Sequence, residues 1–285
     1  MLFINNQEDL DKACKSMAYS QILSVDTEFL RRDTYFPILS IIQIKMKDHN
    51  IVIDVLSNIN LLPFKDLLLN NKILKIFHAP REDFFIFYYL FKILPQNIFD
   101  TQLAADVCNI GNSLSYSDLC YKICGVTIDK KYQKANWLER PINIDMLNYA
   151  IKDVEYLENI YEVLMKIIRE KNLYDNYQNK INSLLDHQNY IANSKKIVKK
   201  IHFQDHSEDF MSRMEIFVSY REELAIQLNL PRQHFINDKD LVKICQRLPI
   251  SEKDLSKLDI TSKYLNQSKY KNQLFDLILG FSELN

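Results

Sequence analysis

Glycine is scarce in this chain, which has only three glycines among 285 residues. Neither a G-x-G-x-x-G nor a G-x-x-x-x-G-K-[ST] sequence occurs. The Rossmann and P-loop folds need such glycines to bring the backbone close to nucleotide phosphates. The composition therefore excludes both classes of nucleotide-binding protein, and we expect no nucleotide cofactor.

The chain also lacks an excess of either charge and a long apolar segment. Lysine and arginine number 36 and aspartate and glutamate 37, so a nucleic-acid partner would need a local basic surface. The most apolar run, Phe84–Leu94, is about half the length of a membrane span and contains Lys92. The acidic N-terminal segment has no apolar core of the kind found in signal peptides. We expect a cytoplasmic, monomeric protein with no membrane partner.

Cysteines are few and scattered. Five occur, and this odd number in a chain of ordinary domain size favours reduced thiols over a disulfide framework. Cys120 and Cys124 have C-x-x-x-C spacing, but no second ligand pair with zinc spacing accompanies them. We interpret both as small buried hydrophobic residues on one helix face.

The hydrophobic periodicity predicts an α/β domain with a mixed sheet, followed by a helical region. We expect an α/β domain over residues 1–172, a connecting helix or linker over 173–204 and a small all-α domain over 205–285. The predicted strands are Ile22–Asp26, Leu39–Lys45, Ile51–Asp54 and Ile73–Phe77. The predicted helices are Leu61–Asn70, Glu82–Leu94, Thr101–Asn109, Ser115–Cys124 and a long helix, Ile144–Lys171.

Two carboxylates lie at the end of the first strong strand. Asp26 and Glu28 are two residues apart, so they point to the same face of the strand. Two carboxylates so placed repel each other unless a cation lies between them. A lone D-x-E is usually an ordinary polar strand end, so the pair becomes informative only together with further acids.

Three further acids have suggestive positions. Asp83 opens an apolar helix, where a role beside the helix dipole is the alternative. Asp100 precedes a helix and reads as its N-cap. Asp153 follows Tyr149 by four residues, so the two share one helix face, although an exposed acid would look the same.

These segments together resemble bacterial ribonuclease D. Asp26-Thr27-Glu28-Phe29 with the residues up to Pro37 resembles the first exonuclease motif, and His78-Ala79-x-x-Glu82-Asp83 resembles the second. Phe99-Asp100-Thr101-Gln102 resembles the segment that follows, and Tyr149-Ala150-x-x-Asp153 resembles the third motif in its tyrosine form. The resemblance covers about residues 1–172. It implies the ribonuclease-H-like fold of the DEDD exonucleases.

The resemblance also implies a set of functional residues. Asp26, Glu28, Asp83 and Asp153 would hold two divalent ions, Mg²⁺ or Mn²⁺, and Tyr149 would orient the attacking water. Carboxylate oxygens suit such ions. The candidate substrate contacts are Thr27, Phe29, His78 and Gln102. A structural hydrogen-bonding role is the alternative for His78, and core packing is the alternative for Phe29. We expect Trp137, the only tryptophan, to be a packing anchor, with substrate contact as the alternative.

Residues from about 205 to 285 resemble one HRDC domain, a small helical module. The matching positions include Tyr220-Arg221-Glu222, Leu230-Pro231-Arg232 and Leu248-Pro249. Well-known bacterial ribonuclease D proteins carry two such modules, and this chain has room for one. The resemblance implies phosphate contacts from lysine and arginine. A domain that only packs on the nuclease is the alternative.

The resemblance predicts a metal-dependent 3′-to-5′ exoribonuclease. It would hydrolyse phosphodiester bonds at the 3′ ends of structured RNA, tRNA precursors above all, and release nucleoside 5′-monophosphates. A 3′-to-5′ DNA exonuclease is the nearest alternative, because the carboxylates do not contact the sugar. An inactive RNA-binding scaffold is the alternative from another class.

Overall fold

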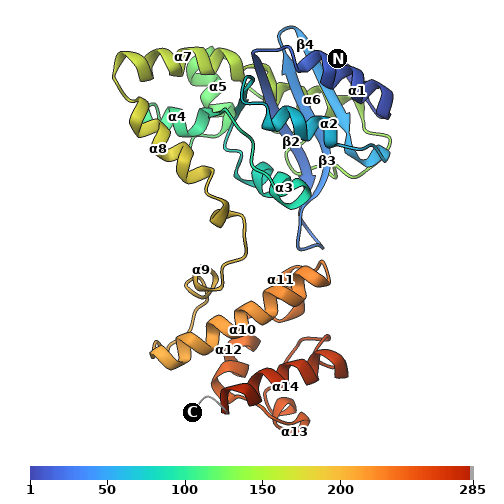
Figure 1. Ribbon diagram of the computed structural model, residues 1–285, viewed down its shortest axis with the longest axis vertical. Helices are drawn as coiled ribbons and strands as arrows, with labels where there is room; N and C mark the ends of the chain where they lie inside the picture. Colours follow the sequence, from blue (N-terminus) through green and yellow to red (C-terminus); the bar gives the residue numbers. More distant parts are fainter. Residues whose placement is uncertain (283–285) are drawn as a thin grey trace. The chain divides into compact units, whose positions relative to one another are not determined.

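The computed structural model describes residues 1–282 and divides them into two compact units (Figure 1). The first unit contains residues 1–30 and 37–190, and the second contains residues 31–36 and the described residues from Ile191 onward. Residues 173–204, expected to connect two domains, are thus shared between the units. The last three residues of the expected tail, 283–285, lie outside the described residues.

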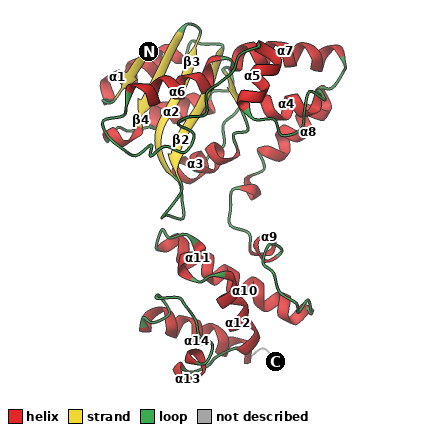
Figure 2. Ribbon diagram, turned by 180° about the vertical axis from the view of Figure 1, so that it is seen from behind, coloured by secondary structure: helices red, strands yellow, loops and turns green. Residues whose placement is uncertain are grey.

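The first unit is built on a six-stranded mixed sheet, in agreement with the predicted fold class (Figure 2). The strand order is β1-β4-β3-β2-β5-β6, and β2, β3 and β4 form an antiparallel centre. The parallel pairs are β1 with β4, β2 with β5 and β5 with β6. The strands are β1 Leu2–Ile4, β2 Ile22–Leu30, β3 Ile38–Met46, β4 His49–Asp54, β5 Leu74–Phe77 and β6 Ile98–Asp100.

Both faces of the sheet are buried because alternate strand residues are apolar on each side. Ile42 and Ile53 pair across β3 and β4 and belong to the main core. Ile41 and Val52 point to the other face, where they pack with Trp137. Trp137 is 2% exposed, so its predicted role as a packing anchor is confirmed. Burial on both faces explains why β3 reads as a nearly continuous apolar run.

Helices surround this sheet, and most lie where the periodicity predicts them. Asp100 caps α4, because its side chain accepts hydrogen bonds from the backbone N–H groups of Gln102 and Leu103. The helices of the first unit are α1 Gln7–Met17, η1 Val55–Ser57, α2 Leu62–Leu69, α3 Arg81–Phe91, α4 Thr101–Val107, α5 Tyr116–Cys124, α6 Ile144–Glu155, α7 Leu157–Glu170, α8 Tyr174–Leu184 and η2 His187–Asn189. The helix α1 was not predicted from the sequence. The strands β1 and β6 were not predicted either, because three residues are too few to show a period.

The predicted single helix over residues 144–171 is wrong, since the chain breaks at Tyr156 into α6 and α7. The Tyr116 hydroxyl donates to the Lys152 carbonyl at 3.0 Å and accepts from the Tyr156 N–H at 3.1 Å. It thus replaces the helical hydrogen bond between these two backbone groups. A side chain inserted in this way is a known cause of helix kinks. The break lies three residues after Asp153.

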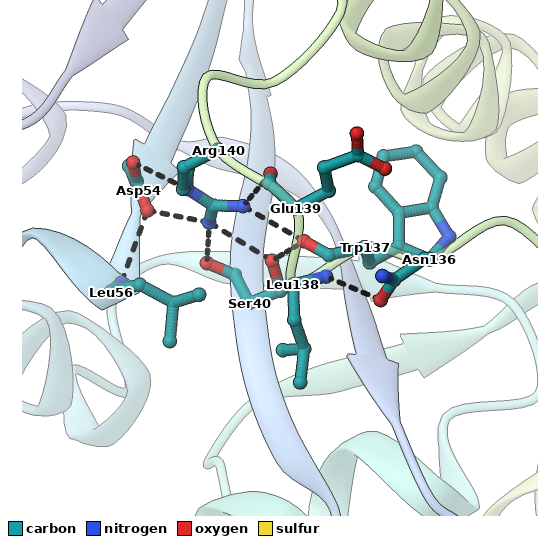
Figure 3. A network of polar contacts seen from close by, with 8 residues as sticks. All are labelled: Ser40, Asp54, Leu56, Asn136, Trp137, Leu138, Glu139 and Arg140. Atoms are coloured by element: carbon teal, nitrogen blue, oxygen red, sulfur yellow. Dashed lines mark hydrogen bonds and ion pairs between the residues drawn. The ribbon is translucent and has the colours of Figure 1, made fainter.

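An arginine fixes the loop that leads into α6 (Figure 3). The Arg140 guanidinium donates to both carboxylate oxygens of Asp54, at 2.9 and 2.7 Å. It also donates to the Trp137 carbonyl at 2.8 Å and to the Ser40 hydroxyl at 3.0 Å. Because Asp54 ends β4 and Ser40 belongs to β3, one side chain ties the loop to two strands. This bidentate geometry is specific to arginine.

The second unit is all-helical and has its own apolar core. Arg221 and Glu222 of α10 are both buried, and Arg221 donates to Asp238 at 2.6 Å. Glu222 accepts a hydrogen bond from the Tyr35 hydroxyl at 2.7 Å, so residues 31–36 are anchored in this unit. Its helices are α9 Ser194–Val198, α10 Glu208–Gln227, α11 Arg232–Phe235, α12 Asp238–Arg247, α13 Glu252–Ser256 and α14 Ser268–Ser282.

Across the described residues, 1–282, no helix combines the length and the apolar character needed to cross a membrane. Of the connecting segment, α8 packs on α4 and α7 within the first unit, and α9 packs on α10 within the second.

We predict that Arg140→Met destabilises the protein by about 3 kcal/mol, because it leaves the nearly buried Asp54 carboxylate without its ionic partner. Urea unfolding followed by circular dichroism measures this change. Arg169→Ala, at an exposed arginine of α7, is the control and should change the unfolding free energy by less than about 0.5 kcal/mol. Equal losses in the two variants would contradict the structural role of Arg140.

Candidate active site

Three acids predicted from the sequence converge at the far end of β2. Oxygen atoms of Asp26, Glu28 and Asp153 all lie within 4.8 Å of one another. Asp26 and Glu28 are on the face of β2 that α6 covers, because Asp26 pairs with Gln43 and Glu28 with Ile41 of β3. Asp153 comes from α6, which packs against β2 and β3.

The position along β2 explains why space exists there. β2 pairs with β5 only over Ile22–Ser24, so Asp26 and Glu28 lie beyond the end of that pairing. The chain leaves β5 at this point and enters α3, which carries Asp83 in its first turn. A register shift follows Glu28 and ends the regular alternation of the strand.

Asp83 lies beside this cluster but is held from the other side of β2. Its carboxylate accepts a short hydrogen bond from the hydroxyl of Thr27, which points away from the face that carries Asp26. Asp83 is 7% exposed and does not belong to the group of three acids with mutually close oxygens. The structure therefore separates a tight group of three carboxylates from a fourth that is fixed independently.

The acids strongly perturb one another. Burial, and then the charges of the other three acids, raise the pKa of Asp26 well above its usual value. Burial, followed by the charges of Asp153 and Asp83, raises the pKa of Glu28 to about 9. Burial raises the pKa of Asp153 to about 7 and that of Asp83 to about 6, although the Thr27 hydroxyl lowers the latter. In the described part of the chain, no lysine or arginine pairs with these acids. Hard oxygen donors in a repulsive cluster fit one or more divalent cations.

Tyr149 lies one helical turn before Asp153 on the same face of α6. Its ring contacts Tyr132 and Trp137, with centroids 6.0 and 6.2 Å apart. Burial and then the charges of Asp153, Glu28 and Asp26 raise the pKa of its hydroxyl. The phenol is therefore neutral at physiological pH and lies within the field of the three acids.

Several of the predicted substrate-contact residues have partners within the protein. His78 uses both ring nitrogens, at 2.9 Å from the Thr101 hydroxyl and 3.1 Å from the Leu114 carbonyl. Burial lowers the pKa of His78 to about 4, which agrees with a structural role. Gln102 also donates to the Leu114 carbonyl, at 2.9 Å. Phe29 packs against the main core.

The sequence patterns gave no role to two residues that lie beside the site, Tyr116 and Gln43. Tyr116 fixes the turn of α6 that follows Asp153, as described above. Gln43 interrupts the apolar run of β3, and its fully buried amide lies on the same face as the Asp26 carboxylate. A single glutamine within LSIIQIK was the available signal for Gln43, whereas nothing local to Tyr116 distinguishes it from other tyrosines.

The raised pKa values predict how stability depends on pH without metal. Acids whose folded pKa exceeds the unfolded value of about 4 stabilise the folded state at low pH, and this contribution is lost as the pH rises. In EDTA, the unfolding temperature should therefore fall between pH 6 and pH 9.

Asp26→Asn removes one of the repelling charges, so it should raise the unfolding temperature at pH 8. Differential scanning calorimetry compares it with Asp175→Asn, an exposed acid of α8 that should have little effect. A lower unfolding temperature for Asp26→Asn at pH 8 would refute the proposed repulsion.

Known proteins resemble this chain along most of its length. A family model described as 3′-5′ exonuclease matches residues 1–169. Ribonuclease D of Bartonella henselae is 33% identical over 92% of this chain, which spans 65% of that protein. Ribonuclease D of Nitrobacter hamburgensis is 30% identical over 95% of this chain, which spans 71% of that protein.

A solved structure agrees with these sequence matches. The crystal structure of Escherichia coli RNase D superposes on 98% of this chain and 74% of its own length, with a TM-score of 0.86 at 24% identity. That likeness establishes the fold, and the family follows from the sequence matches over both the exonuclease segment and most of the chain. This chain therefore belongs to the ribonuclease D family of 3′-5′ exonucleases.

Proposed function

We propose that the protein is a cytoplasmic, metal-dependent exoribonuclease that removes nucleotides from RNA 3′ ends. The observation that carries the proposal is the convergence of Asp26, Glu28 and Asp153 with Tyr149 beside them and Asp83 close by. A structural cluster of this kind has no evident use, because its mutual repulsion opposes folding. Metal-dependent hydrolysis of a phosphodiester bond, in contrast, needs a cluster of carboxylates that can hold divalent cations.

The four acids would hold two divalent cations, Mg²⁺ or Mn²⁺. Asp26 is assigned to both ions, Glu28 and Asp153 to the ion beside the attacking water, and Asp83 to the second. When bound, such ions lower the pKa of water and stabilise the attacking and leaving oxygens of an in-line displacement. The independent fixation of Asp83 by Thr27 supports its separate role.

Tyr149 would orient the attacking water through its neutral hydroxyl. The raised pKa makes the phenolate rare at neutral pH, so the group acts by hydrogen bonding rather than as a free base. Its ring is held between Tyr132 and Trp137, and Arg140 fixes the loop that carries Trp137. The hydroxyl is thereby positioned at a rigid point beside the three acids.

The substrates would be structured RNAs with 3′ extensions, tRNA precursors among them, and the products nucleoside 5′-monophosphates. The second unit would act as an HRDC-like module that binds the RNA backbone. A local concentration of positive charge lies in and directly after α9 of this unit, at Lys195, Lys196, Lys199 and Lys200.

We predict that Asp26→Asn abolishes RNA degradation in Mg²⁺ or Mn²⁺, because the variant loses the charge assigned to both ions. Purified protein is incubated with 3′-extended tRNA and with matched single-stranded DNA, with either metal or EDTA, and products are resolved by gel electrophoresis. Asp175→Asn should retain activity. Full activity of a folded Asp26→Asn protein would disprove the metal assignment, and preferential cleavage of DNA would replace the proposed substrate.

A second prediction concerns Tyr149→Phe, which should lower the turnover number by about 10²- to 10⁴-fold while leaving metal affinity unchanged. Single-turnover kinetics measures the rate, and calorimetric titration with Mn²⁺ measures the affinity. Tyr19→Phe, at a tyrosine that is 91% exposed, is the control. An unchanged rate, or loss of Mn²⁺ binding, would rule out the assigned role.

A further inference from the structure

A cavity of about 400 Å³ lies within the first unit, next to the helix that carries Asp83. It is formed where the turn between β5 and α3 meets α4, α8 and η2. Ala79 lines it from the turn and Arg81 from the start of α3, Gln102 and Leu103 from α4, and Ser183 and Leu184 from α8. Its volume falls within the range of small-molecule sites in proteins.

Most of the charged groups of the lining are already paired. The Asp100 carboxylate accepts hydrogen bonds from the backbone N–H groups of Ala79, Gln102 and Leu103. The Lys180 ammonium lies 2.6 Å from an oxygen of Asp106. Arg81 is exposed, and within residues 1–282 its guanidinium forms no hydrogen bond or ion pair. One cation with unused donors thus remains at the cavity, which suits an anionic group.

The rest of the lining suits the other parts of a nucleotide. Leu103 and Leu184 offer apolar surface, and Gln102 and Ser183 offer polar groups. Two hydrogen bonds connect the residues of this wall: the Tyr190 hydroxyl donates to the Leu184 carbonyl at 2.7 Å and the Asn189 amide donates to the Ser183 carbonyl at 2.8 Å. An arginine paired with a mixed apolar and polar wall is the usual chemistry of phosphate and base recognition.

The position of the cavity relates it to the candidate active site. Arg81 and Asp83 occupy the first turn of the same helix, two residues apart. The charges of Arg81, Asp100 and Asp83 all act on the Tyr190 hydroxyl, which lines the cavity. A nucleotide in the cavity would therefore lie beside α3, the helix that carries Asp83.

We propose that this cavity binds one nucleotide of the RNA strand adjacent to the cleavage site, with a backbone phosphate against the Arg81 guanidinium. This inference rests on the proposed function. The same chemistry would also accept a free nucleoside 5′-monophosphate, the product of the reaction, so the experiment separates the two sources.

The test measures binding and turnover for the full chain and its variants. Binding of a labelled five-nucleotide RNA is followed by fluorescence anisotropy in EDTA, where no cleavage occurs. Arg81→Ala should weaken binding and raise the KM about tenfold, the usual effect of losing one charged hydrogen bond, with kcat changed less than about twofold. Arg81→Lys should restore part of the affinity. Arg169→Ala removes an exposed arginine elsewhere and should match the wild type.

A second variant tests the cavity without removing the charge. Ser183→Trp places a large side chain in the lining and should reproduce the loss of RNA affinity. Inhibition by adenosine 5′-monophosphate should be equally strong in the wild type and in the Arg81→Ala variant. Unchanged RNA affinity in both Arg81→Ala and Ser183→Trp would overturn the proposal. It would also be overturned if the two substitutions changed only the inhibition by the monophosphate and not the binding of RNA. Wild-type protein that binds the RNA but never cleaves it would instead refute the proposed function, and the binding comparison would still decide the role of the cavity.

Discussion

Electrostatic repulsion among four carboxylates, one buried and three half-buried, is the constraint around which the first unit is organised. Side chains that repel one another would turn toward water if their backbone could move. Their shared location therefore requires that β2, α3 and α6 be fixed by interactions that do not involve the acids themselves. The structure supplies these through strand pairing along β2 and the packing of α6 on the sheet.

The segment around α6 illustrates how that rigidity arises at both ends of a helix. Arg140 ties the preceding loop to β3 and β4, and the Tyr116 hydroxyl terminates α6 just after Asp153. Between these two points the helix presents Tyr149 and Asp153 at fixed positions. Asp54 on β4, through Arg140, and Tyr116 on α5 thus fix the two ends of α6. Neither residue forms a hydrogen bond with the acids of the site. Such supporting residues matter for precise placement of reacting groups.

The sequence predicted the site better than it predicted what supports the site. Period-two alternation placed Asp26 and Glu28 on one face, and the four-residue spacing placed Tyr149 beside Asp153, because both rules depend only on neighbours along the chain. Asp100 was recognised as an N-cap for the same reason. The break at Tyr156 depends on the Tyr116 hydroxyl, 40 residues away in the sequence, and the ion pair of Asp54 depends on Arg140, 86 residues away. No local pattern carries these pairings, so the long helix over residues 144–171 was predicted wrongly.

The anchoring of residues 31–36 in the helical unit has a consequence for the order of events during synthesis. Tyr35 leaves the ribosome soon after the strand that carries Asp26 and Glu28, but its partner Glu222 follows 187 residues later. At elongation rates of about 5 to 20 residues per second, this separation corresponds to roughly 10 to 40 seconds. During that interval the aromatic pair Tyr35 and Phe36 has no helical core to enter. Until the helical unit has been made, the nascent chain therefore exposes two aromatic side chains beside the strand that carries Asp26 and Glu28.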